Sequence, residues 1–280
     1  MKELKILAIV VAIVGVIYYG VEPYAHHIMH PEVTPPDFKF SDLPVMKTDG
    51  DPAHGKEVVQ ANCVSCHSIT KEGIAAPMDA ASAGASYGVT PPDLSNVGAI
   101  YDANYLANFI ADPTKASQLP EGKTSSMPAL GLSEGDIADA VAYLRSIADK
   151  NLTPQQITHE ACGRCHSIRY EKFAATTPNK DDLKRYLGSV PPDLSQMIKS
   201  AGHHYLEGFI NQPQKLLPGT GMPRVGLTEE AQKKVIEHLE KVGDPKKDER
   251  ERLGLWFILY FAIFTVIAYL WKVKQFRKVH

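Results

Sequence analysis

Two short segments of the chain carry cysteines and a histidine at a spacing that could hold a cofactor. In each, two residues separate the cysteines and the histidine follows the second cysteine directly: Cys63, Cys66 and His67, then Cys162, Cys165 and His166. This spacing lets both thiols form thioethers to the vinyl groups of one haem while the adjacent imidazole reaches the iron. The chain is therefore predicted to bind two haem c groups covalently.

The same cysteine pairs admit two other interpretations. A redox dithiol uses the two-residue spacing but leaves the histidine incidental, and half of a zinc site would still need its remaining ligands. Four cysteines in two local pairs do not form the framework of a disulfide-stapled miniprotein. Haem attachment is the only interpretation that uses all three residues of each segment.

A histidine-bound haem iron takes a second axial ligand, and the sequence offers a methionine for each site. Met127 and Met222 lie about sixty residues after their histidines, each directly before a proline. A thioether ligand stabilises ferrous iron and raises the reduction potential. Met78 is the alternative at the first site, although it has no counterpart at the second. Met46 and Met197 are expected to fill gaps in the core.

These motifs belong to a long internal repeat. Besides the cysteines, the sequence Pro-Pro-Asp-Leu-Ser occurs at 91–95 and at 191–195, and the offsets are 99 residues at the cysteines, 100 at the double proline and 95 at the methionine. The prolines cannot lie inside helices, so their carbonyl groups are free. They could accept the second ring N–H of the haem-binding histidines, or they could form a plain turn.

The elements that position these residues are predicted to be helices. Proline at the first helical position, at 51–52 and 153–154, begins a helix before each cysteine pair. Ser133 and Thr228 cap helices that follow the two methionines and carry apolar residues at helical spacing. No stretch alternates with a period of two, and residues 71–90, rich in Ala, Gly and Ser, are expected to form a surface loop.

Uncharged apolar runs occupy both ends of the chain, at 6–21 and 253–271. The second is long enough to cross roughly 30 Å of hydrocarbon. The first could be a retained anchor or a cleaved signal, and the missing small-residue cleavage motif favours the anchor. Lys2 and Lys5 precede the first run and further basic residues follow the second, so both ends are expected in the cytoplasm.

The predicted fold is therefore all-α, with two tandem class I cytochrome c domains flanked by N- and C-terminal transmembrane helices. The expected divisions are an N-terminal anchor (1–22), a linker (23–50), a first cytochrome c domain (51–150, the first unit), a second (151–243, the second unit) and a charged stalk with the C-terminal anchor (244–280).

Charge and histidine content add little to this assignment. A net charge of −2 excludes the strongly basic class of nucleic-acid-binding proteins. The first unit holds six Lys and Arg against twelve Asp and Glu, and the second twelve against ten. The acidic first unit could steer a basic redox partner, or it could be an ordinary solvated surface. His26, His27 and His30 could suggest a metal or b-type haem site but are expected to be solvated, and His203 and His204, which precede a predicted helix, could equally be surface residues.

The second unit and the C-terminal anchor resemble cytochrome c1. The resemblance covers about residues 155–280 and is carried by Cys165-His166-Ser167-Ile168-Arg169-Tyr170 with Phe173, the double-proline motif at 191–195, Met222-Pro223, and a single C-terminal anchor with a short basic tail. The usual member of that family has one haem and no preceding cytochrome domain. The whole chain is thus similar to the dihaem c1-type subunit of some bacterial complexes.

This resemblance implies an electron-transfer subunit of a bacterial cytochrome bc1 complex, a quinol:cytochrome c oxidoreductase, that is not catalytic alone. Its partners would be the cytochrome b and Rieske iron–sulfur subunits and a soluble cytochrome c or terminal oxidase, with the haem domains in the periplasm and the anchors in the inner membrane. Two other functions stay open. A dihaem subunit of a haem-copper oxidase usually has only an N-terminal anchor, and a dihaem peroxidase-like enzyme needs an open iron site.

Overall fold

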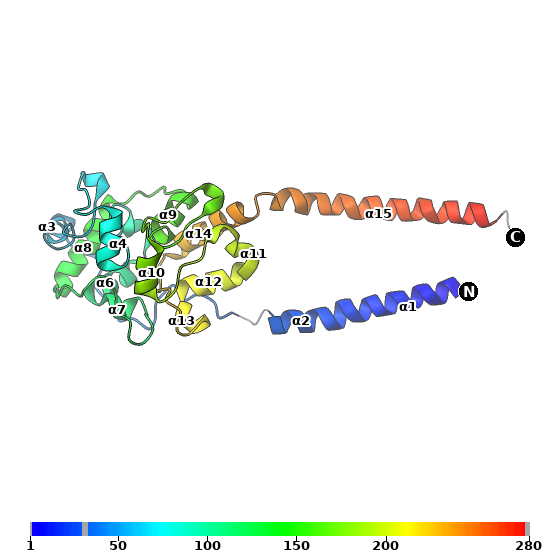
Figure 1. Cartoon of the computed structure of the whole chain (residues 1–280), viewed down its shortest axis with the longest axis horizontal. Coiled ribbons are helices and arrows are strands. Elements are labelled where there is room, and N and C mark those ends of the chain that lie inside the picture. The colour runs from blue at the N-terminus through cyan, green and yellow to red at the C-terminus, as the bar shows by residue number, and fades with distance from the viewer. Residues whose placement is uncertain (1, 30–32, 278–280) are drawn as a thin grey trace.

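The computed structural model describes residues 2–29 and 33–277. These residues form helices and short helical turns, and no strand occurs among them, which confirms the all-α prediction. A helical head carries two long helices that extend from it in the same direction, so that the first and last described residues lie at the same far end (Figure 1). Such an arrangement suits a head held on one side of a membrane.

The two long helices are apolar along most of their length. The N-terminal one comprises α1 (Lys2–Val16), a π-helical turn η1 (Ile17–Val21) and α2 (Glu22–Met29), and the C-terminal one is α15 (Lys247–Phe276). Both are long and apolar enough to cross a membrane. The first continues past residue 22 through Pro23, which lacks a backbone N–H, and the wider turn η1 lies just before this proline.

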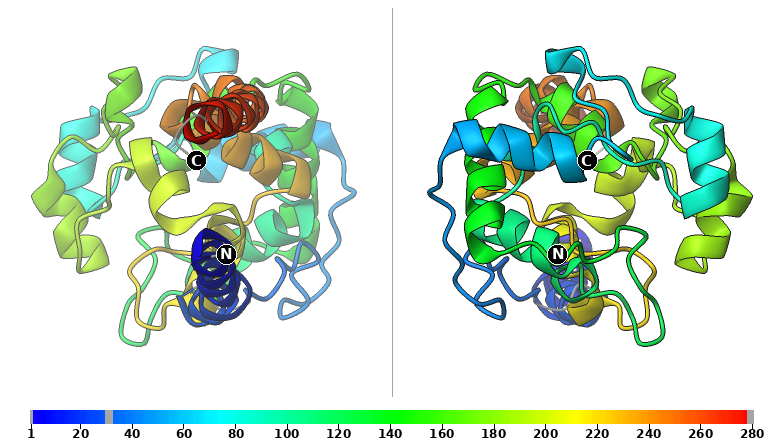
Figure 2. Two further views of the ribbon diagram at one scale, coloured as in Figure 1. Left: turned by 90° about the vertical axis from the view of Figure 1, so that its right-hand side faces the viewer. Right: turned by 90° about the vertical axis from the view of Figure 1, so that its left-hand side faces the viewer.

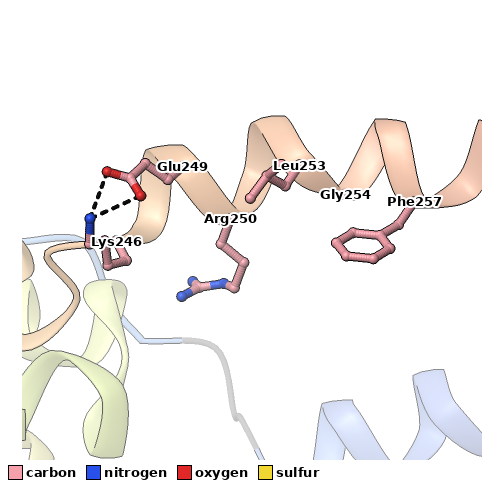
Figure 3. Close-up of a pocket in the computed structure, with 6 residues that line it drawn as sticks. All are labelled: Lys246, Glu249, Arg250, Leu253, Gly254 and Phe257. Atoms are coloured by element: carbon pink, nitrogen blue, oxygen red, sulfur yellow. Dashed lines mark hydrogen bonds and ion pairs between the residues drawn. The ribbon is translucent and has the colours of Figure 1, made fainter.

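Paired charges mark the junction between the head and α15. Lys246 lies 2.8 Å and 3.0 Å from the two carboxylate oxygens of Glu249 (Figure 3). Arg250 donates to both oxygens of Asp244, at 2.9 Å and 2.6 Å. These pairs occupy the predicted charged stalk, and the apolar surface of α15 begins directly after them.

The first unit is built around two crossed helices, α3 and α8. Its elements are α3 (Pro52–Asn62), η2 (Thr70–Glu72), α4 (Ala80–Tyr87), α5 (Val97–Ile100), α6 (Ala103–Ala111), α7 (Pro113–Ala116) and α8 (Glu134–Ile147). Val59 and Val141 are fully buried where α3 packs on α8. Asp51 and Ser133 cap the two helices through their side chains, as predicted.

The second unit repeats this arrangement with α9 and α14. Its elements are α9 (Pro154–Cys162), η3 (Arg169–Glu171), α10 (Lys180–Leu187), η4 (Leu194–Gln196), α11 (Met197–Ala201), α12 (His203–Asn211), α13 (Pro213–Leu216) and α14 (Glu229–Gly243). Thr153 begins α9 with a capping box and Thr228 caps α14. Ile157, Val235 and Ile236 are buried between the two helices.

The expectation of a surface loop over residues 71–90 is wrong for its second half, which forms helix α4. The Asp79 side chain accepts the N–H groups of Ala81 and Ser82 and so begins the helix. Helix α4 lies against α10 of the second unit (Figure 2, right). Gly88, with φ +81°, ends α4, and a Cβ there would lie 2.5 Å from the Tyr186 Cβ. The small residues that suggest a loop therefore permit close helix packing.

The two units are interlocked. Asp102 N–H donates to the Gly226 carbonyl at 2.9 Å, and the Tyr105 hydroxyl donates to the Arg224 carbonyl at 2.8 Å. Ile100 of the first unit is buried in the core of the second. The described part of the predicted linker adds to this contact, because buried Phe40 packs on Tyr105. Residues 33–50 are thus a strap that packs on the head.

Candidate haem sites

The first Cys-x-x-Cys-His segment forms a tight turn at the end of α3. The N–H groups of Cys66 and His67 both donate to the Cys63 carbonyl, at 3.1 Å and 3.0 Å. The His67 ring places Nδ1 at 2.8 Å from the Pro92 carbonyl oxygen. Because a carbonyl oxygen only accepts, Nδ1 carries the proton and Nε2 is left with its lone pair for a metal.

The second segment has the same geometry at the end of α9. Cys165 and His166 donate to the Cys162 carbonyl at 3.2 Å and 3.0 Å, and His166 Nδ1 lies 2.8 Å from the Pro192 carbonyl oxygen. The structure therefore confirms the predicted contact between each histidine and its double-proline segment. Both imidazoles are oriented as ligands with Nε2 available.

Each double-proline segment is itself held by an aspartate, a role that the sequence analysis missed. Asp93 and Asp193 each accept one side-chain hydroxyl and two backbone N–H groups. The donors are Ser68 Oγ, Thr70 N and Ser95 N in the first unit, and Ser167 Oγ, Arg169 N and Ser195 N in the second. The sequence did contain a signal for this role: Asp and Ser recur within both Pro-Pro-Asp-Leu-Ser segments, and a serine follows each of the two histidines.

Protonation of Asp193 should measure the strength of this network. Burial opposes ionisation, but hydrogen bonds from Ser195 and Ser167 outweigh it and lower the pKa of Asp193 to about 2. Because the folded-state pKa lies below the ordinary value, the stabilisation is complete above about pH 4 and is lost as the pH falls towards 2. Asp193→Asn should lower the free energy of unfolding at pH 7 by about 2 kcal/mol.

Chemical denaturation of the two proteins between pH 7 and pH 3 tests this expectation. The difference between them should be constant at high pH and should shrink below about pH 4, where Asp193 of the unfolded parent protein takes up a proton while Asp193 of the folded protein stays ionised. Asp181→Asn is a matched control, because Asp181 lies exposed in the first turn of α10. A difference at Asp193 that is independent of pH would contradict the ionised network.

The cysteine thiols fit thioether formation better than the other two interpretations. Burial raises the pKa of Cys63 to about 11 and that of Cys162 to about 12, and it also raises the pKa of Cys165. A reactive dithiol requires an easily formed thiolate, and among the described residues the two clusters that could hold a metal ion include no cysteine. The histidines also fit haem binding. Burial lowers the pKa of His67 and His166, and this effect outweighs the hydrogen bond to the proline carbonyl, which raises the pKa. Neutral imidazoles can bind iron.

A half-buried cation also fits the charge of a haem. Arg164, inside the second cysteine segment, has a buried Nε that finds no hydrogen-bond partner among the described residues. Burial is the main cause of the lowered pKa of His67, and the charge of Arg164 lowers that pKa further, so Arg164 also lies near the first site. A buried guanidinium N–H without an acceptor is costly, whereas an anionic haem propionate would pair with it.

The two candidate axial methionines occupy equivalent loops. Met127 lies between α7 and α8 and its N–H donates to Ser125 Oγ at 3.2 Å, while Met222 N–H donates to Thr220 Oγ1 at 3.4 Å. Met222 packs against the same core as Cys162. Ligation by either methionine stays a prediction.

Other sequence expectations have definite outcomes. Met46 and Met197 pack against the two cores, as predicted. His203 and His204 are exposed as expected, although they begin α12 rather than precede it. Of the histidines near the first span, His26 and His27 lie on α2, while His30 lies outside the described residues.

The two sites meet at one interface between the units. The hydroxyl of Ser126, next to Met127, donates to the Tyr87 carbonyl at 2.5 Å, and the Ser126 N–H donates to the Tyr186 hydroxyl oxygen at 3.2 Å. Cys165 packs against a small core that includes Val89 of the first unit. Residues beside Met127 thus contact the second unit, and the second cysteine segment contacts the first unit.

Comparison with known proteins finds a family model that matches the first unit. The family model described as Cytochrome c matches residues 52–148, a range that includes Cys63, Cys66, His67 and Met127. This match implies a covalently bound c-type haem and suggests electron transfer for the matched residues. The curated proteins contain no match to the chain. A solved structure titled "Hyperthermophilic respiratory Complex III" is similar at 20% identity and a TM-score of 0.33, over 96% of this chain and 99% of that one.

Proposed function

We propose that the chain transfers electrons through two haems, one bound by Cys63, Cys66, His67 and Met127 and the other by Cys162, Cys165, His166 and Met222. The observation that carries the proposal is the repeated contact between the histidine Nδ1 and a proline carbonyl at 2.8 Å, which orients an imidazole beside each cysteine pair. The haem supplies one-electron exchange at its iron. The protein would orient the axial ligands and tune the reduction potential through them.

We further infer that the chain is the cytochrome c1-type subunit of a bacterial quinol:cytochrome c oxidoreductase. The motifs of the second unit support this role, and so do two long apolar helices that leave the head in the same direction (Figure 1). In this role the helices lie in the inner membrane and the head lies in the periplasm. Cytochrome b and Rieske subunits are the partners within the complex.

In the proposed electron path, the second haem is reduced by the Rieske protein and the first haem passes the electron on. Helices α11 and α12 of the second unit lie at the end of the head nearest the membrane helices, while α3 of the first unit lies at the opposite end (Figure 1). The first unit also holds twelve acidic against six basic residues. An acidic surface far from the membrane suits a soluble, basic cytochrome c as acceptor.

Purification of the tagged full chain from its own membranes tests the complex. Cytochrome b and a Rieske protein should be recovered with it, and quinol should reduce its haems through them. Recovery of a copper-containing catalytic subunit instead would contradict the proposal and favour the oxidase.

Carbon monoxide provides a separate check on catalysis at a haem. If both irons carry methionine, the reduced protein should bind carbon monoxide only slowly, because the gas must displace a ligand. Absorption spectra recorded over time after mixing give the rate, and the denatured protein supplies the fast reference. Rapid binding at one haem without denaturation would indicate a peroxidase-like enzyme or a gas sensor.

The order of the two haems can be tested with point variants. Removal of residues 51–150 would not be a clean test, since it removes Ile100 from the core of the second unit. In the complex carrying Cys63→Ala and Cys66→Ala, quinol should still reduce the second haem, while electron transfer to soluble cytochrome c should fall steeply. Stopped-flow absorption follows the reduction of the second haem by quinol. If this reduction is lost in the variant, the first haem is the one reduced by the Rieske protein, and the proposed order is wrong.

A further inference from the structure

Away from the cysteine segments, three side chains of the second unit converge on one point. His159 comes from α9, Glu171 from the end of η3 and His238 from α14. The Nε2 atoms of both histidines lie 3.1 Å from the same carboxylate oxygen, Glu171 Oε2. All three ligand atoms lie within 4.8 Å of one another.

This spacing suits a tetrahedral metal ion. Zinc binds imidazole nitrogen and carboxylate oxygen at about 2.0–2.2 Å, which places neighbouring ligand atoms about 3.3 Å apart. The two observed nitrogen–oxygen separations are close to that value. Two imidazoles and one carboxylate, with one position left for water, form a known zinc ligand set and suit other divalent transition metals as well.

The surroundings hold the three ligands in place and leave one side open. The His159 ring stacks on Phe173 with centroids 3.9 Å apart, and the other carboxylate oxygen of Glu171 accepts from Gln155 at 3.2 Å. The His238 side chain is 8% exposed, whereas those of His159 and Glu171 are 25% and 20% exposed. An ion could enter from solvent and keep a water ligand.

The internal repeat supplies a direct comparison, because the first unit has the carboxylate without the histidines. With offsets of 99 and 95 residues, the equivalents of His159, Glu171 and His238 are Gln60, Glu72 and Tyr143. There, Glu72 pairs with Lys56 at 2.6 Å, and a lysine amine excludes a cation from the position. The common fold therefore does not require the histidine pair, which is specific to the second unit.

We infer that His159, Glu171 and His238 form a binding site for a divalent transition-metal ion, with zinc as the ion that fits the donor set best. The ion joins α9 and α14 to the turn η3, in which Glu171 lies five residues after His166, a haem ligand in the proposed function. The site is independent of the proposed electron path. A second cluster, His203, His204 and Glu207, is more exposed and lies on the first turns of a single helix.

Zinc titration of the full-length, haem-loaded protein in detergent, after treatment with a chelator, tests the site. One zinc ion per chain should bind tightly, and each of His159→Gln, Glu171→Gln and His238→Gln should weaken binding at least about tenfold. His203→Gln with His204→Gln is the matched control and should leave the tight site intact. Thermal unfolding without zinc identifies any variant that fails to fold.

X-ray absorption at the zinc edge gives a test that depends on no variant. The zinc-loaded parent protein should show two imidazole nitrogens together with oxygen ligands in the first coordination sphere. The inference is overturned if the parent protein binds no zinc at one ion per chain, if the three variants bind it as tightly as the parent, or if the ion shows sulfur ligands. A purely hydrogen-bonded cluster would give the first of these results.

Discussion

Replacing Cys162 and Cys165 by alanine should leave the chain with one covalently bound haem instead of two. The thioethers at this segment require both of its sulfur atoms, and Cys63 and Cys66 form a cysteine pair of their own at the end of α3, so the first haem should be retained. The reciprocal variant should retain only the second. The alkaline pyridine spectrum per chain, with the mass of the intact protein, gives the count directly.

This experiment decides the number of haems, because the family model covers only the first unit. The parent protein should contain two haems, each pair variant one, and the fourfold variant none. Ser65→Ala is a suitable control, since Ser65 lies between the first two cysteines and holds neither haem. A parent protein with a single haem that survives Cys162→Ala and Cys165→Ala would disprove the second site.

Replacing Met222 by histidine should lower the reduction potential of one haem by on the order of 0.1–0.3 V and leave the other nearly unchanged. Thioether ligation stabilises ferrous iron, whereas a second imidazole favours the ferric form, and axial ligands tune haem potentials over about 0.8 V. Met127→His should act in the same way on the other haem. A redox titration followed by visible absorption separates the two components.

Two methionines serve as controls for this assignment. Met197→Leu removes a thioether that packs on the core of the second unit, and it should leave both potentials unchanged. Met78→Leu tests the alternative ligand of the first site, in the turn before α4. If Met78→Leu shifts one potential while Met127→His shifts none, the first haem is bound by Met78.

Some features of the protein follow from local sequence alone. Helix starts at 51–52 and 153–154, and the caps Ser133 and Thr228, were predictable because capping involves residues only a few positions apart. The Cys-x-x-Cys-His segments are equally local, and the repeat assigned the same chemistry to both. The helical class and the two apolar ends could be predicted from composition and from the spacing of apolar residues alone.

Tertiary structure decided the features that depend on contacts between distant residues. Residues 80–86 have only small side chains and a weak amphipathic pattern, so nothing local predicted that α4 would pack on α10, 100 residues later in the chain. The strap at 33–50 has no periodicity and is fixed by Phe40 and its neighbours in a core made mostly by other segments.

The sequence by itself determined which atoms could bind haem, because the residues that do so lie within two five-residue Cys-x-x-Cys-His motifs and their repeat. Only the tertiary structure decided that both histidines face proline carbonyls, that aspartates hold those carbonyl segments, and that the two sites share an interface. The same holds for His159, Glu171 and His238, which are up to 79 residues apart in the chain and become neighbours only when α9 packs across α14. Packing of distant segments is a property of the whole core, and spacing along the chain does not encode it.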